Sequence, residues 1–307
     1  MQSRISAFGN KIGRVRMISS VDRHTIKTSD GVMLAVSSAG DGDAIAFVHE
    51  FSGDLRSWAP QFADFQAGYR CIAFNARGYP PSNVPASLAA YSQERAADDV
   101  AETLQALGVG KVHLVGLSMG GFAVLHTAIR HPALVASLVV AGCGYGAKPS
   151  EQDAYQVAMN REAEHAEDIG MRAYAEEMGA ARYAKLLRAK DERAWELFVE
   201  QLTEHSIDGM TMTLRGVLAR RPSLWHLEEQ LSKMSCPVLL VVGDEDTPCI
   251  EPNLFMKGLL PDCALCVMPR TGHLPNLEEP ARFNEIIGRF IASVTDGSWE
   301  RVRKSFI

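Results

Sequence analysis

The sequence predicts an α/β protein in which helices flank a mostly parallel β-sheet. Short apolar runs alternate with longer amphipathic stretches along most of the 307 residues, as repeated βαβ units do. Glycines punctuate the ends of these runs, which distinguishes them from segments of buried helix. With 47% apolar and 22% charged residues, the chain has an ordinary globular composition and enough length for a sizeable core.

The expected strands are short, apolar and rich in β-branched residues. They span 31–38, 44–49, 69–74, 112–115, 135–141, 237–243 and 263–269. Helices are expected over 55–65, 91–107, 122–129, 253–260 and 276–293. Ser92 has the side chain of an N-cap for the second of these helices, and Gly108 ends it. Residues 1–30 are expected to be a leader that contributes at most an edge strand.

The alternation of strands and helices stops between Lys148 and Lys233. This stretch is rich in Ala, Glu, Arg and Met, with helical spacing around 154–178, 193–205 and 210–218. A crossover helix needs far fewer than these roughly 85 residues. We therefore expect a helical cap over 148–233, inserted into a core domain formed by 1–147 and 234–307.

The segment KVHLVGLSMGG, residues 111–121, carries the main functional signal. It predicts a buried strand that ends in a tight turn and continues as a helix. Ser118 lies in a G-x-S-x-G pattern at this turn, where small neighbours leave the serine oxygen clear at the edge of the sheet. A serine nucleophile also needs a base within hydrogen-bond reach and a third group that orients the base.

Two loops after the insertion contain a base and an acid. VVGDEDTP places Asp244, Glu245 and Asp246 directly after a strand, and His273 follows the last strand. One helix and one strand separate the two loops, so both lie at the sheet edge that carries Ser118. Asp246 fits best as the orienting acid because it completes Gly-x-x-Asp, while Asp244 and Glu245 remain alternatives.

GLSMGG, GDEDTP and TGH followed by NLEEP, in this order and spacing, resemble the motifs of the α/β-hydrolase superfamily. The resemblance covers about 31–293 apart from the insertion. It implies an α/β-hydrolase fold with a helical cap and no cofactor. It further implies Ser118 as the nucleophile, His273 as general base and then general acid, and Asp246 as the acid that orients His273.

The segment from His49 to Gly53 resembles the oxyanion loop of this superfamily. The amides of Phe51 and Met119 would then meet the developing oxyanion, each contributing about 3–4 kcal/mol in the transition state, and His49 would hold the loop. Glu50 stands where the family usually has glycine. Either its side chain turns to solvent, or it lies beside the pocket, where it tunes His273 or contacts substrate. The following loop, 75–79, is expected to brace the site.

Charge and cysteine usage exclude several classes of protein. The formal net charge is −6, and no basic patch suggests a nucleic acid or an anionic membrane as partner. No apolar run approaches the ~20 residues that span a bilayer, and the N-terminus lacks the apolar core of a signal peptide. Cys263 and Cys266 form a lone C-x-x-C, which is a weak metal signal. We expect a cytoplasmic enzyme without a metal that acts on a small, largely apolar molecule.

The expected reaction is hydrolysis of a carboxylic ester or a lactone through a serine acyl-enzyme. Two alternatives stay open. In these, the protein is either a hydrolase of carbon–carbon bonds in vinylogous diketones from ring fission, or a non-catalytic receptor for a small ligand. Leu274 argues mildly against the first, because such relatives tend to carry Trp after the histidine. Haloalkane dehalogenase and epoxide hydrolase relatives use Asp where Ser118 stands.

The cap offers no motif that identifies the natural substrate. Its methionines and tryptophans either line an apolar pocket or form the core of the cap; they are Met159, Met171, Met178, Met210, Met212, Trp195 and Trp225. Its arginines are expected mostly on a solvated face, although one of them can meet a substrate carboxylate; they are Arg161, Arg172, Arg215, Arg220 and Arg221. The oligomeric state has no signal in the sequence.

Overall fold

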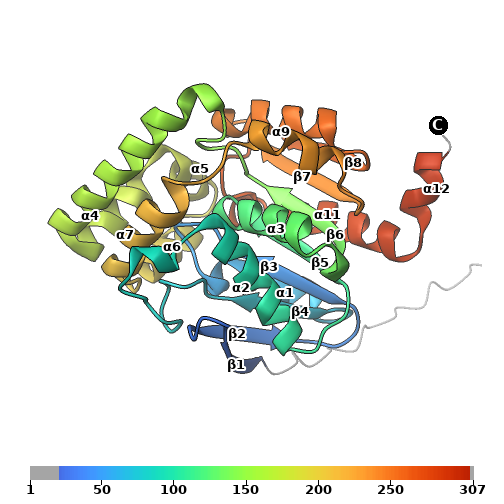
Figure 1. Ribbon diagram of the computed structural model, residues 1–307, viewed down its shortest axis with the longest axis horizontal. Coiled ribbons are helices and arrows are strands. Elements are labelled where there is room, and N and C mark those ends of the chain that lie inside the picture. Colours follow the sequence, from blue (N-terminus) through green and yellow to red (C-terminus); the bar gives the residue numbers. More distant parts are fainter. Residues whose placement is uncertain (1–20, 305–307) are drawn as a thin grey trace, which may run out of the picture.

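A mostly parallel eight-stranded sheet forms the centre of the protein (Figure 1). The computed structural model describes residues 21–304, so the expectations for residues 1–20 lie outside the described part. The strand order is β1-β2-β4-β3-β5-β6-β7-β8; β2 runs antiparallel to β1 and β4, and all other neighbours are parallel. The strands are β1 Asp22–Lys27, β2 Met33–Ala39, β3 Ala44–Val48, β4 Arg70–Phe74, β5 Val112–Leu117, β6 Val135–Ala141, β7 Val238–Gly243 and β8 Cys263–Met268. The predicted α/β class and the predicted strands are confirmed.

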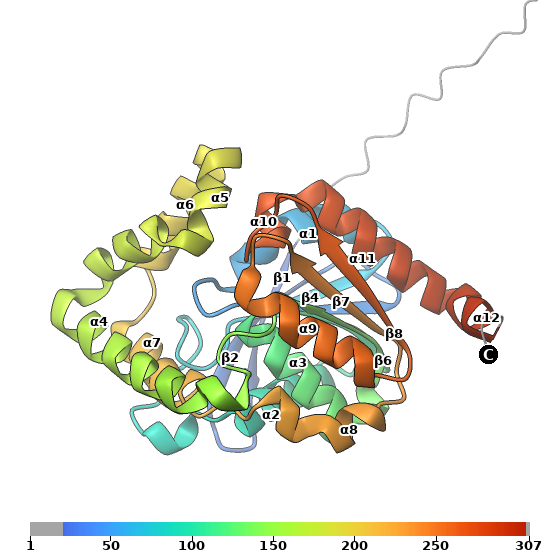
Figure 2. The same cartoon turned by 90° about the horizontal axis from the view of Figure 1, so that it is seen from above.

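Helices cover both faces of the sheet (Figure 2). Helices α1 and α11 lie on one face, and α2, α3, α8 and α9 lie on the other. Their bounds are α1 Ala59–Phe65, α2 Gln93–Ala106, α3 Met119–Arg130, α8 Glu228–Ser232, α9 Thr247–Leu259 and α11 Pro280–Thr295. Ser92 caps α2 as expected, since its side chain accepts from the Arg95 amide. No helix within 21–304 is both long and apolar enough to cross a bilayer.

Strand β3 shows why the central strands read as continuous apolar runs. Alternate side chains of a strand point to opposite faces, and here each face has its own core. Ile45 and Phe47 join the cluster that contains Trp58 on the α1 face, where the rings of Phe47 and Trp58 are 5.1 Å apart. Ala46 and Val48 join the cluster under α2 and α3. Both faces are therefore sealed, and the ends of the strands remain as the place for a site.

Prolines shift three of the predicted helix boundaries. The expected helix 55–65 splits into a 3₁₀ turn at Leu55–Trp58 and α1, which has Pro60 in its first turn. The expected helix 276–293 splits into α10 Pro275–Glu278 and α11, which begins with Pro280. Helix α9 begins at Thr247, not at 253, because Pro248 fits the first turn. In each case a proline stands in the first turn of the observed helix and marks its start.

The inserted segment is mostly helical, and its helices α4 to α7 lie at one end of the sheet (Figures 1 and 2). It contains α4 Gln152–Ala180, α5 Arg182–Lys190, α6 Glu192–Thr203 and α7 Ile207–Thr213, with short turns before α8. Helix α4 is interrupted at Gly170, whose φ of 77° and ψ of 163° are not helical. Helices α5 and α8 were not predicted. The helical character of the insertion is confirmed, and its division from the core at 147/148 and 233/234 stays a prediction.

Replacing Gly120 by alanine is expected to lower the free energy of unfolding by roughly 1–3 kcal/mol. Helix α3 packs so closely on the end of β3 that a Cβ at residue 120 would lie 2.1 Å from the Val48 carbonyl oxygen. Urea unfolding measures the change. Gly258→Ala in α9 is the matched control, since its Cβ would meet nothing within 4 Å. Equal stability of the two variants would contradict this packing.

Candidate active site

Ser118 occupies a strained turn between β5 and α3. Its φ is 54° and its ψ is −112°, a conformation that side-chain-bearing residues rarely adopt. The turn closes only because its neighbours are small; a Cβ at Gly116 would lie 2.2 Å from the Gly120 carbonyl oxygen. The helix that follows directs its free N–H groups and the positive end of its dipole toward this edge of the sheet.

Ser118, His273 and Asp246 form a continuous chain of hydrogen bonds. Ser118 Oγ lies 2.9 Å from His273 Nε2, and His273 Nδ1 lies 2.8 Å from Asp246 Oδ2. Since a carboxylate only accepts, Nδ1 carries the proton, and Nε2 is free to accept the proton of Ser118. The structure therefore brings the three predicted residues together from the ends of β5, β7 and β8. Such a chain can convert a serine hydroxyl into a nucleophile.

The acid loop after β7 separates its three carboxylates. Asp246 is buried and faces His273, whereas Asp244 and Glu245 are exposed. Asp244 Oδ1 instead accepts from the Thr271 amide at 3.2 Å, which ties the acid loop to the histidine loop. Burial lowers the pKa of His273, but Asp246, with smaller contributions from other acids, raises it above its ordinary value. The site therefore favours the imidazolium that forms when serine loses its proton.

Glu278 holds the loop that carries His273, a role that was not predicted. This buried carboxylate accepts from the Gly272 amide at 2.7 Å and from the Leu274 amide at 2.9 Å, on either side of the histidine. Glu278 belongs to the NLEEP motif, for whose residues no role was predicted. The signal was present, since an acid at the first turn of a helix can accept amides from the preceding loop.

His49 orients the loop after β3. Its Nδ1 lies 2.7 Å from the Glu50 carbonyl oxygen, and its Nε2 accepts from the Ala76 amide at 3.0 Å. Nδ1 is therefore the protonated nitrogen, and burial lowers the pKa of His49 to about 4, which keeps the ring neutral. Because a trans peptide unit is planar, fixing the Glu50 carbonyl also fixes the N–H of Phe51 on the opposite side. Tyr79 adds a 2.8 Å bond to the Phe51 carbonyl.

The loop 75–79 braces this arrangement. Asn75 Oδ1 accepts from the Leu55 amide at 2.9 Å, and its Nδ2 donates to the Pro80 carbonyl at 2.7 Å. Arg77 is buried and pairs with Asp99 at 2.7 Å and with Asp30 at 2.9 Å. These contacts agree with the structural role expected for the loop.

Glu50 lies inside the site, so the interpretation that it turns to solvent is wrong. Only 1% of the residue is exposed; Oε1 accepts from Ser57 Oγ at 3.1 Å, and Oε2 has no partner among the described residues. Gly53 provides the space, because a Cβ there would lie 2.0 Å from Oε1. Burial, assisted by the charge of Asp54, raises the pKa of Glu50 to about 7, although His273 opposes the shift. This carboxyl group therefore changes charge near neutral pH beside the reacting groups.

A cavity of about 280 Å³ opens onto Ser118 between the sheet edge and the cap. Of the predicted cap residues, Met159, Met178 and Arg221 line it, whereas Met210 is buried in the core and Trp225 stacks on Phe255. Tyrosines form much of the remaining wall. The lining consists of Glu50, Phe51, Ser52, Ser118, Tyr145, Tyr155, Met159, Glu162, Tyr174, Met178, Tyr183, Leu214, Leu218, Arg221 and His273.

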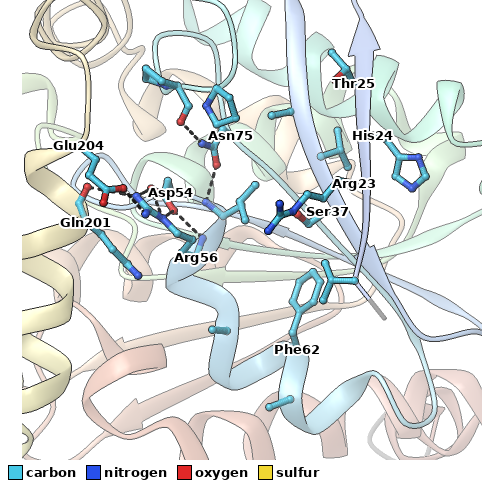
Figure 3. Close-up of a pocket in the computed structure, with 18 of the residues that line it drawn as sticks. Arg23, His24, Thr25, Ser37, Asp54, Arg56, Phe62, Asn75, Gln201 and Glu204 are labelled. Carbon is cyan, nitrogen blue, oxygen red and sulfur yellow. Dashed lines mark hydrogen bonds and ion pairs between the residues drawn. The ribbon is translucent and has the colours of Figure 1, made fainter. Parts of the chain in front are cut away.

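A larger hollow, of about 1010 Å³, lies elsewhere (Figure 3). Strands β1 and β2, helix α1 and helix α6 supply its walls, and the Asp54–Arg56–Glu204 ion pairs cross one side. Ser118, Asp246 and His273 do not line this larger hollow. We therefore assign the chemistry to the smaller cavity.

The two cysteines of the C-x-x-C pattern are not arranged to bind one metal ion together. Cys263 and Cys266 are three residues apart on β8, so their side chains point to opposite faces. Within residues 21–304, Asp246, Cys249 and His273 do group their possible ligand atoms within 4.8 Å. However, Asp246 and His273 already bond each other, and burial raises the pKa of the Cys249 thiol well above its usual range. A protonated thiol in this place fits packing better than ligation.

Residues 43–280 match the family described as alpha/beta hydrolase fold, and the chain belongs to this family. A relative from Bacillus subtilis, provisionally named 2-succinyl-6-hydroxy-2,4-cyclohexadiene-1-carboxylate synthase, is 28% identical and covers 88% of this chain and 98% of its own. The 3-oxoadipate enol-lactonase 1 of Acinetobacter baylyi is 26% identical, with 90% and 100% covered. An esterase from Thermogutta terrifontis, solved with malate bound, has a TM-score of 0.77 at 27% identity, with 89% and 99% covered. Together, the family and such relatives support hydrolase activity.

Replacing Glu50 by glutamine is expected to move the rising limb of the kcat/KM profile to lower pH. A general base must be neutral to accept a proton, so the limb follows the pKa of His273, which the charge of Glu50 raises. Glutamine keeps the shape and removes the charge. The profile is measured from about pH 5 to about pH 9. Glu162→Gln is the control, because Glu162 lines the same cavity but is not among the largest contributors to this pKa, as Glu50 is. If the rising limb of Glu50→Gln lies at the same pH as that of the wild type or at a higher pH, the charge of Glu50 does not raise the pKa of His273.

Proposed function

We propose that the protein is a serine hydrolase that cleaves a small carboxylic ester or lactone. The observation that supports it most is the unbroken hydrogen-bond chain from Ser118 through His273 to Asp246, on a cavity just large enough for a small ligand. The relatives named as an enol-lactonase and an esterase agree with this class of reaction. In the proposed reaction, the three residues act as nucleophile, base and orienting acid.

In the acylation step, Ser118 Oγ attacks the carbonyl carbon as its proton passes to His273 Nε2. Asp246 stabilises the imidazolium through the bond to Nδ1. The proton then moves from Nε2 to the leaving alkoxide. A water molecule attacks the acyl-enzyme with His273 as base and releases the acid.

The oxyanion is held by the amides of Phe51 and Met119 in this proposal. Met119 is the first residue of α3, so its N–H belongs to the helix end that favours negative charge. The Phe51 amide is fixed through His49 and the Glu50 carbonyl. Donors that are fixed before the reaction need no reorganisation in the transition state. Glu50 belongs to this loop and lines the cavity; its charge raises the pKa of His273, and its Oε2 has no partner among the described residues.

The cavity limits the size of the substrate. Sites for drug-sized ligands usually measure about 300–1,000 Å³, and this one is about 280 Å³. Tyrosine rings, Met159 and Met178 suit the apolar body of a small molecule. A short acyl chain or a small lactone fits this volume, and a long fatty acyl chain does not.

A fluorophosphonate probe is expected to label the wild-type protein on Ser118. The label should disappear in Ser118→Ala, and kcat/KM for esters should fall at least about 10⁴-fold, as expected when a serine nucleophile is removed. Ser52→Ala is the control, because Ser52 lines the same cavity but lies outside the hydrogen-bond chain. Folded wild-type protein that takes up no label would rule out a serine hydrolase and favour a binding protein.

A series of p-nitrophenyl esters from acetyl to decanoyl is expected to show a preference for the short acyl chains. The volume of the cavity is the reason, and kcat/KM across the series is the measurement. A coloured dienoate from ring fission, run in parallel, tests carbon–carbon cleavage. Faster cleavage of the dienoate than of every ester would replace the ester proposal by its alternative.

A further inference from the structure

Arg221 lies in the catalytic cavity without an acidic partner. The residue is 5% exposed and shares the cavity lining with Ser118 and His273. Its Nη1 donates to the Tyr145 carbonyl oxygen at 3.0 Å, while Nε has no hydrogen-bond partner among residues 21–304. No carboxylate of the described residues lies within the 4.0 Å of an ion pair with this guanidinium.

The other deeply buried arginine among the described residues, Arg77, differs from Arg221 because it has carboxylate partners. Arg77 is 4% exposed and pairs with two carboxylates, those of Asp99 and Asp30. An isolated buried charge is unfavourable, and proteins pair it or hydrogen-bond it fully. The fold neutralises Arg77 with its own carboxylates, whereas Arg221 lines the cavity without a carboxylate partner among the described residues. This difference suggests that the counter-charge of Arg221 arrives with a ligand.

Aromatic rings fix the position of the guanidinium beside helix α3. Arg221 Cζ lies 4.1 Å from the centroid of the Phe122 ring and 5.6 Å from that of Tyr155. The Phe122 amide bonds the Ser118 carbonyl oxygen at 3.1 Å, so the guanidinium packs on the first turn of the helix that begins at the nucleophile. A planar, oriented guanidinium is suited to two-point recognition of a carboxylate.

The acids near this cavity do not neutralise Arg221. Glu50 and Glu162 share the lining, and Asp153 lines an adjacent outer hollow together with Arg221. The carboxyl of Glu50 has Ser57 as its partner, and Glu162 interacts with the hydroxyl of Tyr174. The positive charge therefore remains available to an anionic group in the cavity.

We propose that Arg221 binds a carboxylate of the substrate, so that the substrate is a small ester or lactone that also carries a free carboxylate group. The ester or lactone part rests on the proposed function, whereas the carboxylate subsite does not. The volume of the cavity restricts such a molecule to a short chain or a single small ring between the two groups.

A structural role is the rival explanation for Arg221. The bond to the Tyr145 carbonyl and the contact with Phe122 would also suit a residue that only supports the cavity wall, whose Tyr145 ring lies 5.1 Å from the His273 ring. If Arg221 only supports the wall, replacing it should weaken the binding of neutral and anionic ligands equally. If Arg221 forms a carboxylate subsite, replacing it should weaken the binding of anionic ligands only.

Calorimetric titration of the full chain with succinate, glutarate and adipate, each beside its diamide, measures this preference directly. We expect the wild type to bind at least one diacid at least tenfold more tightly than its diamide. Arg221→Gln should lose this preference, and Arg220→Gln, the exposed neighbour, should keep it. If Arg221→Gln does not fold, Arg221→Lys gives the readout, with the preference reduced but present. Equal preference in wild type and Arg221→Gln, or no diacid binding by the wild type in the millimolar range, would overturn the proposal.

Hydrolysis of monomethyl and dimethyl glutarate separates the subsite from the proposed function. If both hold, the wild type favours the monoester anion at least tenfold in kcat/KM, and Arg221→Gln does not. Cleavage of the neutral diester without such a preference would overturn the subsite and leave the hydrolase intact. Diacid binding that depends on Arg221, without any ester cleavage or fluorophosphonate labelling, would support the subsite and overturn the hydrolase.

Discussion

The close approach of helix α3 to the ends of β3 and β5 sets the geometry of the site. Glycines at 116 and 120 allow the backbones to meet at distances that any Cβ would prevent. This contact holds Ser118 in its strained conformation and presents its Oγ to His273. It also places the start of α3 against the loop after β3. The nucleophile and the loop expected to hold the oxyanion are therefore positioned by the same packing.

The loops around the site are held by buried side chains that bond backbone groups. His49 bonds the Glu50 carbonyl and the Ala76 amide, and Glu278 bonds two amides beside His273. Most buried polar groups of a fold are satisfied in this way. Thirteen buried side-chain atoms of the described residues lack a hydrogen-bond partner, and most of them lie outside the catalytic cavity. Glu50 Oε2 and Arg221 Nε are among them and belong to residues that line the cavity, where a ligand can complete them.

The sequence predicts the sheet and the grouping of Ser118, His273 and Asp246 well because both have local signals. Buried parallel strands read as short apolar runs, and Ser118, Asp246 and His273 each follow such a run. Local patterns did not predict the orientation of Glu50, because the space for its side chain is created by Gly53 and the packing around it. Arg221 stood among five cap arginines without a distinguishing signal. Its burial depends on Phe122 and Tyr155, which lie far from it in sequence.

The structure of the cap was also predicted only in part. Its helices were recognised from composition, but the interruption at Gly170 and the helix α5 were not predicted, since neither has a strong periodic signal. The cap supplies most of the cavity wall opposite Ser118. Sequence patterns therefore indicate the class of enzyme more readily than the molecule on which it acts.

Mapping the acyl group in a rapidly quenched reaction tests the central claim most directly. The protein is mixed with a short activated ester, quenched in acid within milliseconds to seconds, digested and analysed by peptide mass spectrometry. A transient acyl group is expected on the peptide that contains Ser118, and it should disappear as the ester is consumed. Turnover without any acylated peptide, or with the acyl group on another residue, would contradict the proposed mechanism.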